Sequence, residues 1–389
     1  MRLLQRLIQH LQHPPPWRWL CNDLFWQRVG TAPLWQLPLE LLQQLHWWLI
    51  VPLRKGNHGL DLVHNTPLSL RLLACRLNSY RPRELQWWWA AGVRNWKELS
   101  CHIPESLVNQ LHRERRHDWP GQCRTALEIL RNKAALLELT PQSLRPAFQV
   151  LNSHNADIST PCWWWDSLNQ SGLILKPIRG HAGRGVVHFR LNEQSLNQEG
   201  LFHQLPPKTP TWTATQPANP GELHRHWQEI TGNFEPALAS PYLNHCPLLP
   251  DTHPSVVVRV LTKQAEPGAR IKVTLAWLEV PLADSAVAFL DLNGQPLPKP
   301  GEPFTTEQHE ELQNWQEQMK GQGHQAIEAC LEAAVTIHGL LPPIDQVAWD
   351  WIPADPEPLL LEGNGGFGQL VPQLFEYLRQ STDHTATSC

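Results

Sequence analysis

One short stretch, residues 173 to 186, restricts the fold of this chain more than any other. It reads Leu-Ile-Leu-Lys-Pro-Ile-Arg-Gly-His-Ala-Gly-Arg-Gly-Val, so an apolar strand delivers Lys176 to a glycine-rich loop, and a second strand follows. Because the lysine precedes the glycines and no helix follows, the segment is neither a Walker A loop nor a Rossmann turn. Glycines let backbone amides approach phosphate oxygens closely. The stretch predicts a phosphate-binding hairpin, with a purely structural glycine hairpin as the alternative.

A second pair of expected strands carries acidic and amide side chains. Val-Ala-Trp-Asp-Trp at 347–351 precedes Leu-Leu-Leu-Glu-Gly-Asn-Gly-Gly at 359–366. Strand alternation puts Glu362 and Asn364 on one face, and Asp350 lies on the preceding strand. Magnesium takes one or two carboxylates and completes its shell with water and phosphate oxygens. The pattern predicts a magnesium site, with ordinary polar residues at strand ends as the alternative.

The chain divides into a helical first part and a mixed second part. Up to about Leu139, apolar residues recur at helical spacings; after Leu151, β-rich runs alternate with helical patterns, which predicts an α+β fold. The expected strands are 172–175, 185–190, 255–262, 270–277, 346–351 and 358–362, the expected helices 307–320 and 324–338, and the Pro-rich stretch 205–220 a loop. The expected domains are a helical, Trp-rich region at 1–125, an α+β domain at 126–380 and a frayed tail at 381–389.

Tryptophan is unusually frequent, with 20 Trp in the chain, most of them before residue 166. The clusters Trp47-Trp48 and Trp87-Trp88-Trp89 have two interpretations. They are core aromatics that pack helices together, or a stacking platform for a sugar or a partner surface. The basic run at 113–117 is expected to be a solvated helix face.

Composition excludes several classes of protein. Hydrophobic residues are 41% and charged residues 17% of the 389, which excludes a disordered or fibrous chain. The balance of 32 basic against 36 acidic residues gives no case for a nucleic-acid partner. The best membrane-span candidate, Leu37 to Leu53, is too short and too polar, so no transmembrane segment is expected. The first residues do not resemble a secretory signal, and the eight Cys form no CxxC pair. We therefore expect a cytoplasmic protein with reduced thiols.

Together the two motifs resemble the ATP-grasp superfamily. The order is that of the family: a lysine, a glycine-rich hairpin, then an Asp and a Glu-x-Asn on the last strands of the sheet. The resemblance covers roughly residues 130 to 375 and implies a fold in which two α+β subdomains sandwich ATP. The chain looks most similar to the sugar-transfer-associated ATP-grasp proteins. That narrower resemblance rests on Leu-Asn-His-Cys-Pro-Leu at 243–248, on 254–262, and on Trp349-Asp350 ahead of Glu362.

The resemblance implies which residues bind the nucleotide. Lys176 is expected to contact the ATP phosphates. A further lysine belongs upstream in a helix, and Lys133 in the stretch 131–136 matches it, with a solvated helix lysine as the alternative. The loop over the β- and γ-phosphates corresponds to Gly180, Gly183, Arg184 and Gly185.

The resemblance also implies metal ligands and a reaction. Glu362 and Asn364 hold magnesium, and Asp350 holds a second or shared ion. Arg259 stabilises charge on the transferring phosphoryl group, with Lys176 as the other catalytic residue. The implied reaction is Mg-ATP-dependent ligation, in which a small-molecule carboxylate becomes an acylphosphate that an amine or similar nucleophile attacks. The implied setting is polysaccharide or cell-surface sugar metabolism.

Two features depart from the family pattern. The hinge segment that meets adenine and ribose commonly carries an acidic residue or glutamine, but 236–242 has none and only Glu235 precedes it. Relatives tend to carry another arginine after the second strand of the Arg259 hairpin. Here that position reads Trp-Leu-Glu at 277–279, with Lys272 as a candidate substitute. A small-molecule kinase of the same fold and a non-catalytic ATP-binding module therefore stay open as alternatives.

Overall fold

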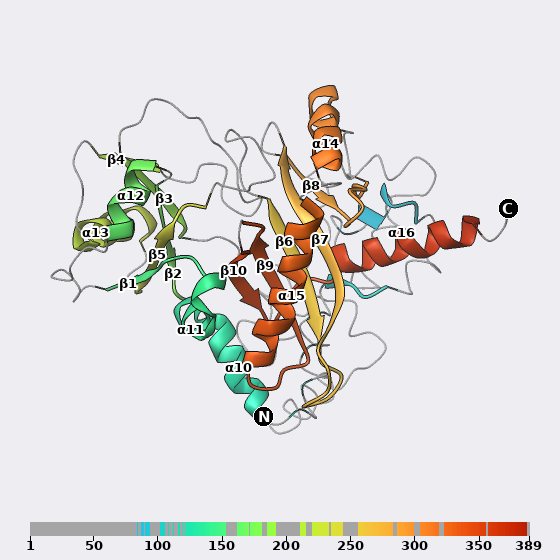
Figure 1. Ribbon diagram of the computed structural model, residues 1–389, viewed down its shortest axis with the longest axis horizontal. Helices are drawn as coiled ribbons and strands as arrows, with labels where there is room; N and C mark the ends of the chain where they lie inside the picture. The colour runs from blue at the N-terminus through green and yellow to red at the C-terminus, as the bar shows by residue number, and fades with distance from the viewer. Residues whose placement is uncertain are drawn as a thin grey trace, which may run out of the picture. The chain divides into compact units, whose positions relative to one another are not determined.

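The structure is a computed structural model of the chain (Figure 1). It describes residues 121–152, 162–170, 172–180, 185–191, 211–214, 220–232, 235–243, 256–282, 286–298, 304–318, 323–354 and 357–386, with scattered residues between 84 and 119. The chain forms two compact units. Unit 1 comprises Met1–Glu114, Leu297–Pro303 and Gly368–Cys389, and unit 2 comprises Arg115–Pro296 and Phe304–Phe367.

The first sheet of unit 2 has five strands in the order β1-β5-β2-β3-β4. Its neighbours are antiparallel except β3 and β4, which are parallel. The strands are β1 (Gln149–Leu151), β2 (Leu173–Pro177), β3 (Val187–Leu191), β4 (Thr211–Ala214) and β5 (Ala237–Pro241). Helix α12 (Cys162–Gln170) packs on β2, β3 and β5, and α13 (Pro220–Thr231) contacts β1.

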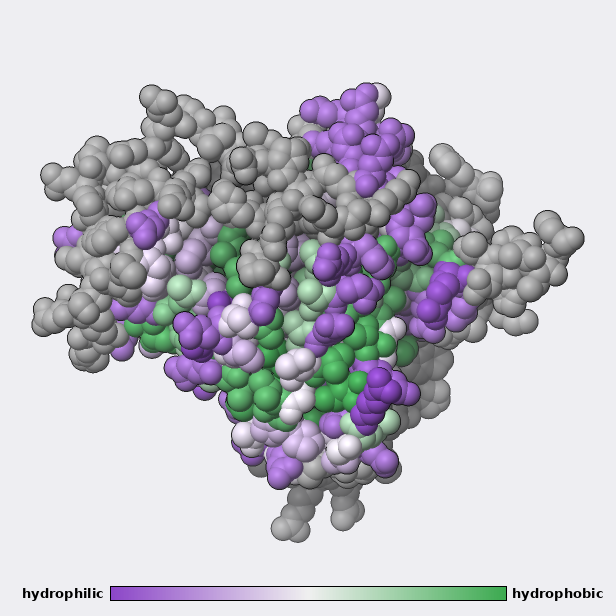
Figure 2. Space-filling view, viewed as in Figure 1, coloured by the Kyte–Doolittle hydropathy of each residue, from purple (hydrophilic) through white to green (hydrophobic). Residues whose placement is uncertain are grey.

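The second sheet of unit 2 is antiparallel throughout, in the order β10-β9-β6-β7-β8. The strands are β6 (Val257–Lys263), β7 (Lys272–Leu282), β8 (Ala286–Leu290), β9 (Gln346–Ile352) and β10 (Leu359–Asn364). Helix α15 (His324–Leu340) lies across β6, β7 and β9, while α10 (Gln122–Arg131) and α11 (Lys133–Leu139) contact β10 (Figure 1). Helix α14 (Thr306–Gln318) contacts β7, and Figure 2 shows its surface as almost uniformly hydrophilic.

Each sheet of unit 2 has its own hydrophobic core. Trp164 and Trp227 are fully buried in the core of the first sheet, where two large aromatic side chains supply much of the apolar burial. In the second sheet, Val258, Val260 and Trp349 are fully buried in the same core as residues of α15. Since side chains alternate along a strand, the residues between them point to the opposite face of the sheet.

A buried chain of hydrogen bonds joins β9, β6 and α15. Trp349 Nε1 donates to Thr262 Oγ1 at 2.7 Å. His338 Nε2 lies 3.0 Å from the Ile344 carbonyl, which can only accept, so Nδ1 is the acceptor for the Thr262 hydroxyl at 2.7 Å. Burial lowers the pKa of His338, which keeps the ring neutral as this chain requires. The network fixes the position of β9 beside β6.

Unit 1 joins the N-terminal part of the chain to the C-terminal helix α16 (Leu370–Ala386). Trp88 is 1% exposed and stacks on His102 at a centroid distance of 3.9 Å, with the Tyr377 ring edge-on at 6.1 Å. For Trp88, the core interpretation of the Trp clusters is therefore the one observed. Trp47 and Trp48 lie outside the described residues.

The α+β class predicted for the second part of the chain is confirmed, and strands β2, β3, β6, β7, β9 and β10 and helices α14 and α15 fall where expected. The expected loop at 205–220 was wrong in part, because Thr-Trp-Thr-Ala at 211–214 forms the short strand β4. Helix α10 crosses the expected boundary at 125/126, and α16 continues to Ala386 inside the expected tail. No helix among the described residues is long and apolar enough to cross a membrane.

Candidate active site

Lys133 is the first residue of α11, and the local sequence explains its position. Asn132 is extended and caps the helix, since its side chain accepts a hydrogen bond from the Ala135 amide. The Lys133 amide, which has no partner inside the helix, donates to the Ile178 carbonyl at 3.1 Å. This bond ties the start of α11 to the residue that follows β2.

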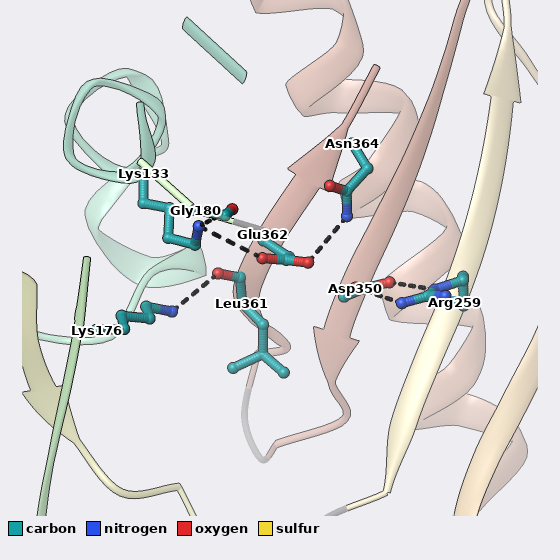
Figure 3. Close-up of polar contacts among 8 residues, drawn as sticks. All are labelled: Lys133, Lys176, Gly180, Arg259, Asp350, Leu361, Glu362 and Asn364. Atoms are coloured by element: carbon teal, nitrogen blue, oxygen red, sulfur yellow. Dashed lines mark hydrogen bonds and ion pairs between the residues drawn. The ribbon is translucent and has the colours of Figure 1, made fainter. Parts of the chain in front are cut away.

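The Lys133 side chain reaches both the glycine loop and the second sheet. Its Nζ donates to the Gly180 carbonyl at 3.1 Å and lies 3.9 Å from Glu362 Oε2 (Figure 3). The side chain is only 12% exposed. This placement contradicts the solvated-lysine alternative, because the side chain is buried and paired.

Lys176 is the last residue but one of β2 and lies on the face opposite the buried Leu173 and Leu175. Its Nζ lies 3.4 Å from the Leu361 carbonyl on β10 (Figure 3). Burial lowers the pKa of Lys176 to about 8, although the Glu362 carboxylate opposes that effect. The side chain is therefore a cation held in a site that disfavours its charge, and an anionic ligand would relieve this.

Strand β10 carries a bulge that sets the direction of its acidic side chain. Leu360 pairs with Trp351, but Glu362 pairs with Asp350, so Leu361 is an extra residue. Asn364 Nδ2 donates to Glu362 Oε1 at 3.0 Å, which confirms that the two residues share a face. Burial alone raises the pKa of Glu362, but the Lys133 ammonium, the Asn364 hydrogen bond and Lys176 lower it below its ordinary value.

The glycine between these two ligands is required by packing. A Cβ at Gly363 would lie 2.7 Å from the Trp349 ring and 2.8 Å from Leu130 on α10. These separations are too short for real contacts, so only glycine lets β10 lie this close to its neighbours.

The turn after β10 is held by a residue that the sequence placed on a solvated face. Arg116 Nε donates to Asp345 Oδ1 at 2.7 Å, and its Nη2 donates to the Gly365 carbonyl. The Arg116 side chain is 12% exposed. The expectation of a solvated face was therefore wrong for Arg116, because an internal carboxylate compensates for its burial.

Arg259 and Asp350 are paired across β6 and β9. Arg259 Nε and Nη2 donate to Asp350 Oδ1 and Oδ2 at 2.5 and 2.7 Å (Figure 3), and its Nη1 lies 3.2 Å from Glu279 Oε1. Burial lowers the pKa of Arg259, but the Asp350 and Glu279 carboxylates raise it by more, so the guanidinium stays charged. These contacts use three of the five N–H donors of the guanidinium, so one N–H on each of Nη1 and Nη2 stays open to a phosphoryl oxygen, and the role expected for Arg259 stays a prediction.

The oxygen donors around Glu362 fit magnesium. The Glu362 side chain is 36% exposed, and carboxylate and amide oxygens are hard ligands. Each Asp350 oxygen accepts one hydrogen bond from Arg259 and keeps a second lone pair, so the metal role expected for Asp350 stays a prediction. Among the described residues there is no cluster of three or more His, Cys, Asp or Glu side chains that could hold a metal. Such a cluster is not needed where phosphates complete the metal shell.

The two described ends of the glycine loop are held by side chains. Gly180 accepts from Lys133, and the Gly185 carbonyl accepts from Trp227 Nε1 at 2.7 Å. Gly185 has a φ of +74°, which favours glycine. Gly183 and Arg184 lie outside the described residues.

Sequence reasoning missed two residues of this region, Trp227 and Glu279. Trp227 gives no local signal because its partner is 42 residues away. Glu279 stood in the sequence where an arginine was sought. The sequence shows an acidic residue at this position, but only the register of β7 against β6 shows that its side chain contacts Arg259.

A separate open cleft of about 710 Å³ lies between the start of β7 and α15. Arg270, Lys272 and Thr336 line it together with apolar residues, and Lys272 is the one candidate named in the sequence analysis that lies there. Lys272 pairs with Lys263 at the far end of the β6–β7 hairpin. It therefore does not substitute for the second arginine beside Arg259.

No family model matches the chain, and no curated protein matches its sequence. VanG D-Ala:D-Ser ligase from Enterococcus faecalis aligns with a TM-score of 0.36 and 12% identity, over 62% of this chain and 54% of that one. D-Alanine–D-alanine ligase from Bacillus anthracis complexed with ATP aligns with a TM-score of 0.34 and 12% identity, over 63% and 59%. The ADP complex of PurK, N5-carboxyaminoimidazole ribonucleotide synthetase, aligns with a TM-score of 0.35 and 10% identity, over 62% and 46%.

The aligned region thus spans about half of the length of these proteins. At these TM-scores the likeness carries no argument about the activity or substrate of this chain. The ATP-grasp expectation therefore depends on the sequence motifs and on the geometry of the site.

Proposed function

We propose that this chain is an Mg-ATP-dependent ligase of the ATP-grasp type, which activates a carboxylate as an acylphosphate for attack by an amine or a similar nucleophile. The observation that carries the proposal is the convergence of three segments far apart in sequence. The start of α11, the end of β2 and the bulged strand β10 bring Lys133, Lys176 and Glu362 together. Two lysines beside a carboxylate–amide pair form a site for a metal-bound polyphosphate.

The residues of the site have distinct roles in this proposal. Lys133 and Lys176 bind phosphate oxygens and offset the repulsion between ATP and the incoming carboxylate. Glu362 and Asn364 would hold magnesium, which when bound neutralises phosphate charge. Arg259 and Asp350 hold β6 and β9 in register beside them. The link to polysaccharide or cell-surface sugar metabolism is supported by the sequence resemblance alone.

Calorimetric titration with ATP, with and without magnesium, tests the proposal on the wild type and on Glu362→Gln. We expect magnesium-dependent binding that Glu362→Gln weakens at least about tenfold, since a charged contact contributes about 1.5–3 kcal/mol. The matched control is Glu332→Gln on the exposed face of α15, which should bind like the wild type. Absence of ATP binding under both conditions would overturn the proposal.

Turnover separates the ligase from a kinase of the same fold. An acylphosphate formed from a carboxylate is trapped by hydroxylamine as a hydroxamate, whereas phosphorylation of an alcohol gives no such product. Hydroxamate that forms only with ATP and a carboxylate supports the ligase. Steady ADP release with a stable phosphate ester as product supports the kinase.

A further inference from the structure

Glu279 brings an acidic side chain to the candidate site that the proposed reaction leaves unused. On the β6–β7 pair, Arg259 lies opposite Trp277, and Val257 lies opposite Glu279. Residues two apart on a strand share a face, so Glu279 is the diagonal neighbour of Arg259 on the site face. Its Oε1 lies 3.2 Å from Arg259 Nη1, and its side chain is 23% exposed.

The Arg259 guanidinium is already paired with two carboxylates. Its Nε and Nη2 donate to Asp350, and its Nη1 contacts Glu279. One positive charge thus faces two negative charges, and the group formed by these three residues has a net negative charge. The resemblance assigns Arg259 to the charge of the transferring phosphoryl group. Because Asp350 and Glu279 both pair with Arg259, this end of the site is net negative instead of positive.

The opposite end of the site has the opposite sign. Lys133 and Lys176 lie beside the single carboxylate of Glu362, which gives a net positive charge next to the glycine loop. The site face of the second sheet is therefore polarised, cationic where β10 meets the first sheet and anionic at β7. A polyphosphate suits the first end, and a cation suits the second.

The chemistry of Glu279 selects a ligand class. Its Oε2 has no hydrogen-bond partner among the described residues, so it can accept from an incoming donor. An ammonium group supplies such donors and a compensating charge, whereas a carboxylate or phosphate would meet a net negative cluster. We propose that Glu279 binds a protonated ammonium group of the acceptor that is separate from the unprotonated amine that attacks the acylphosphate, so that the site selects a small diamine or a similar cationic amine. This inference rests on the proposed ligase function, because it takes the acceptor to enter at the end opposite the phosphates.

Saturation-transfer NMR on the full chain tests the inference, with 1,3-diaminopropane as the cationic probe and 1,3-propanediol as its uncharged match. Mg-ADP is present to fill the nucleotide end. We expect saturable binding of the diamine, none of the diol, and a loss of at least about fivefold in diamine affinity in Glu279→Gln. Glu279→Asp, which keeps the charge, should retain part of the affinity. Glu266→Gln removes an exposed carboxylate in the β6–β7 turn and should bind the diamine like the wild type.

Every other outcome overturns the inference. Equal binding of diamine and diol, wild-type affinity in Glu279→Gln, or no diamine binding excludes selection by Glu279. An equal loss in Glu266→Gln indicates unspecific attraction to acidic surface. Thermal unfolding shows whether Glu279→Gln is folded. If it is not, the diamine affinity of Glu279→Asp is compared with that of the wild type, and an unchanged affinity overturns the inference. A parallel Mg-ATP titration separates the two proposals: intact nucleotide binding without diamine selectivity leaves the proposed function standing, and absent nucleotide binding removes both.

Discussion

Lys176 is the residue whose environment conflicts most directly with its charge. Burial lowers its pKa to about 8, which means that the folded protein disfavours the ammonium form. We expect Lys176→Met to raise the free energy of unfolding by about 1–2 kcal/mol, because one pKa unit corresponds to about 1.4 kcal/mol and part of the gain is lost with the Glu362 contact. The same change should lower ATP affinity more than about tenfold. Denaturant unfolding and calorimetry measure the two effects.

A matched substitution shows whether the effect belongs to the site. Lys263→Met removes an exposed lysine from the end of β6 and should change neither stability nor ATP affinity measurably. If Lys176→Met instead proves less stable than the wild type, the attraction between Lys176 and Glu362 outweighs the burial of the charge.

The same pKa predicts opposite pH trends for binding and for stability. ATP affinity should be constant below about pH 8 and then fall towards tenfold per unit, as Lys176 loses its proton. In the unfolded chain the lysine stays protonated up to its ordinary pKa of 10.5. The unfolded state therefore binds more protons between these values, and the free energy of unfolding should rise with pH there.

Calorimetry and denaturant unfolding at pH 7 to 10 check both trends, with Lys176→Met as the reference. In that variant the affinity should no longer follow a midpoint near 8. An unchanged midpoint in the variant would assign the titration to another group.

At the residue scale, the sequence predicts the position of a side chain where the signal is local. Lys176 lies near the end of an apolar strand before glycines, which predicts that it faces the glycine loop, and alternation predicts that Glu362 and Asn364 share a face. The contacts of Arg259 were not predictable, since its pairing with Asp350 and Glu279 depends on the registers of three strands. The sequence of one strand does not by itself determine which residue of a neighbouring strand lies opposite.

Strand β10 has no room for a side chain at Gly363. A Cβ at Gly363 would lie 2.7 Å from Trp349 and 2.8 Å from Leu130, both in the buried core. We expect Gly363→Ala to lower the free energy of unfolding by about 1–3 kcal/mol, the usual cost of overpacking. Because β10 must shift, it should also weaken magnesium-dependent ATP binding through Glu362 and Asn364.

Gly366→Ala is the matched control for that element. It lies three residues further along, and a Cβ there would have nothing within 4 Å. In denaturant unfolding, the free energy of unfolding of Gly363→Ala should be lower than that of Gly366→Ala by at least about 1 kcal/mol. Equal stability would mean that β10 adjusts to the added methyl group without cost.

Strand β5, which the sequence analysis did not predict, lacks the residue pattern that is typical of a strand. Strand β5 reads Ala-Leu-Ala-Ser-Pro, which is poor in β-branched and aromatic residues, yet it pairs with both β1 and β2. Its small side chains fit a buried strand that lies between two neighbouring strands. This need comes from packing in the folded protein and is not visible in the local sequence. Strands β6 and β9 were predicted because Val, Ile and Trp dominate them.

At the scale of the whole molecule, the two units do not follow chain order. Unit 1 takes in Gly368–Cys389, whereas the sequence assigned most of that segment to the α+β domain. The reason lies in contacts that span the chain. Gln373 on α16 exchanges hydrogen bonds with the Ile103 backbone, at 2.6 Å to its amide and 3.0 Å to its carbonyl. Composition and periodicity cannot reveal a contact between residues so far apart in sequence.

The cap of α16 tests whether the two units lose structure independently. Glu105 Oε1 accepts from the amides of Gln369 and Leu370 at 2.5 and 2.6 Å, so a carboxylate from the N-terminal part caps the C-terminal helix. We expect Glu105→Gln to destabilise α16 by about 1 kcal/mol, since it removes a negative charge from a helix N-terminus. Hydrogen exchange should show about fivefold faster exchange in α16, while β6 and β9 of unit 2 keep wild-type protection. Glu376→Gln, on the exposed face of the same helix, should leave exchange in α16 and in the two strands unchanged.

Equal loss of protection in α16 and in the strands would mean instead that the chain opens as one cooperative structure. In that case the candidate site would depend on the stability of unit 1.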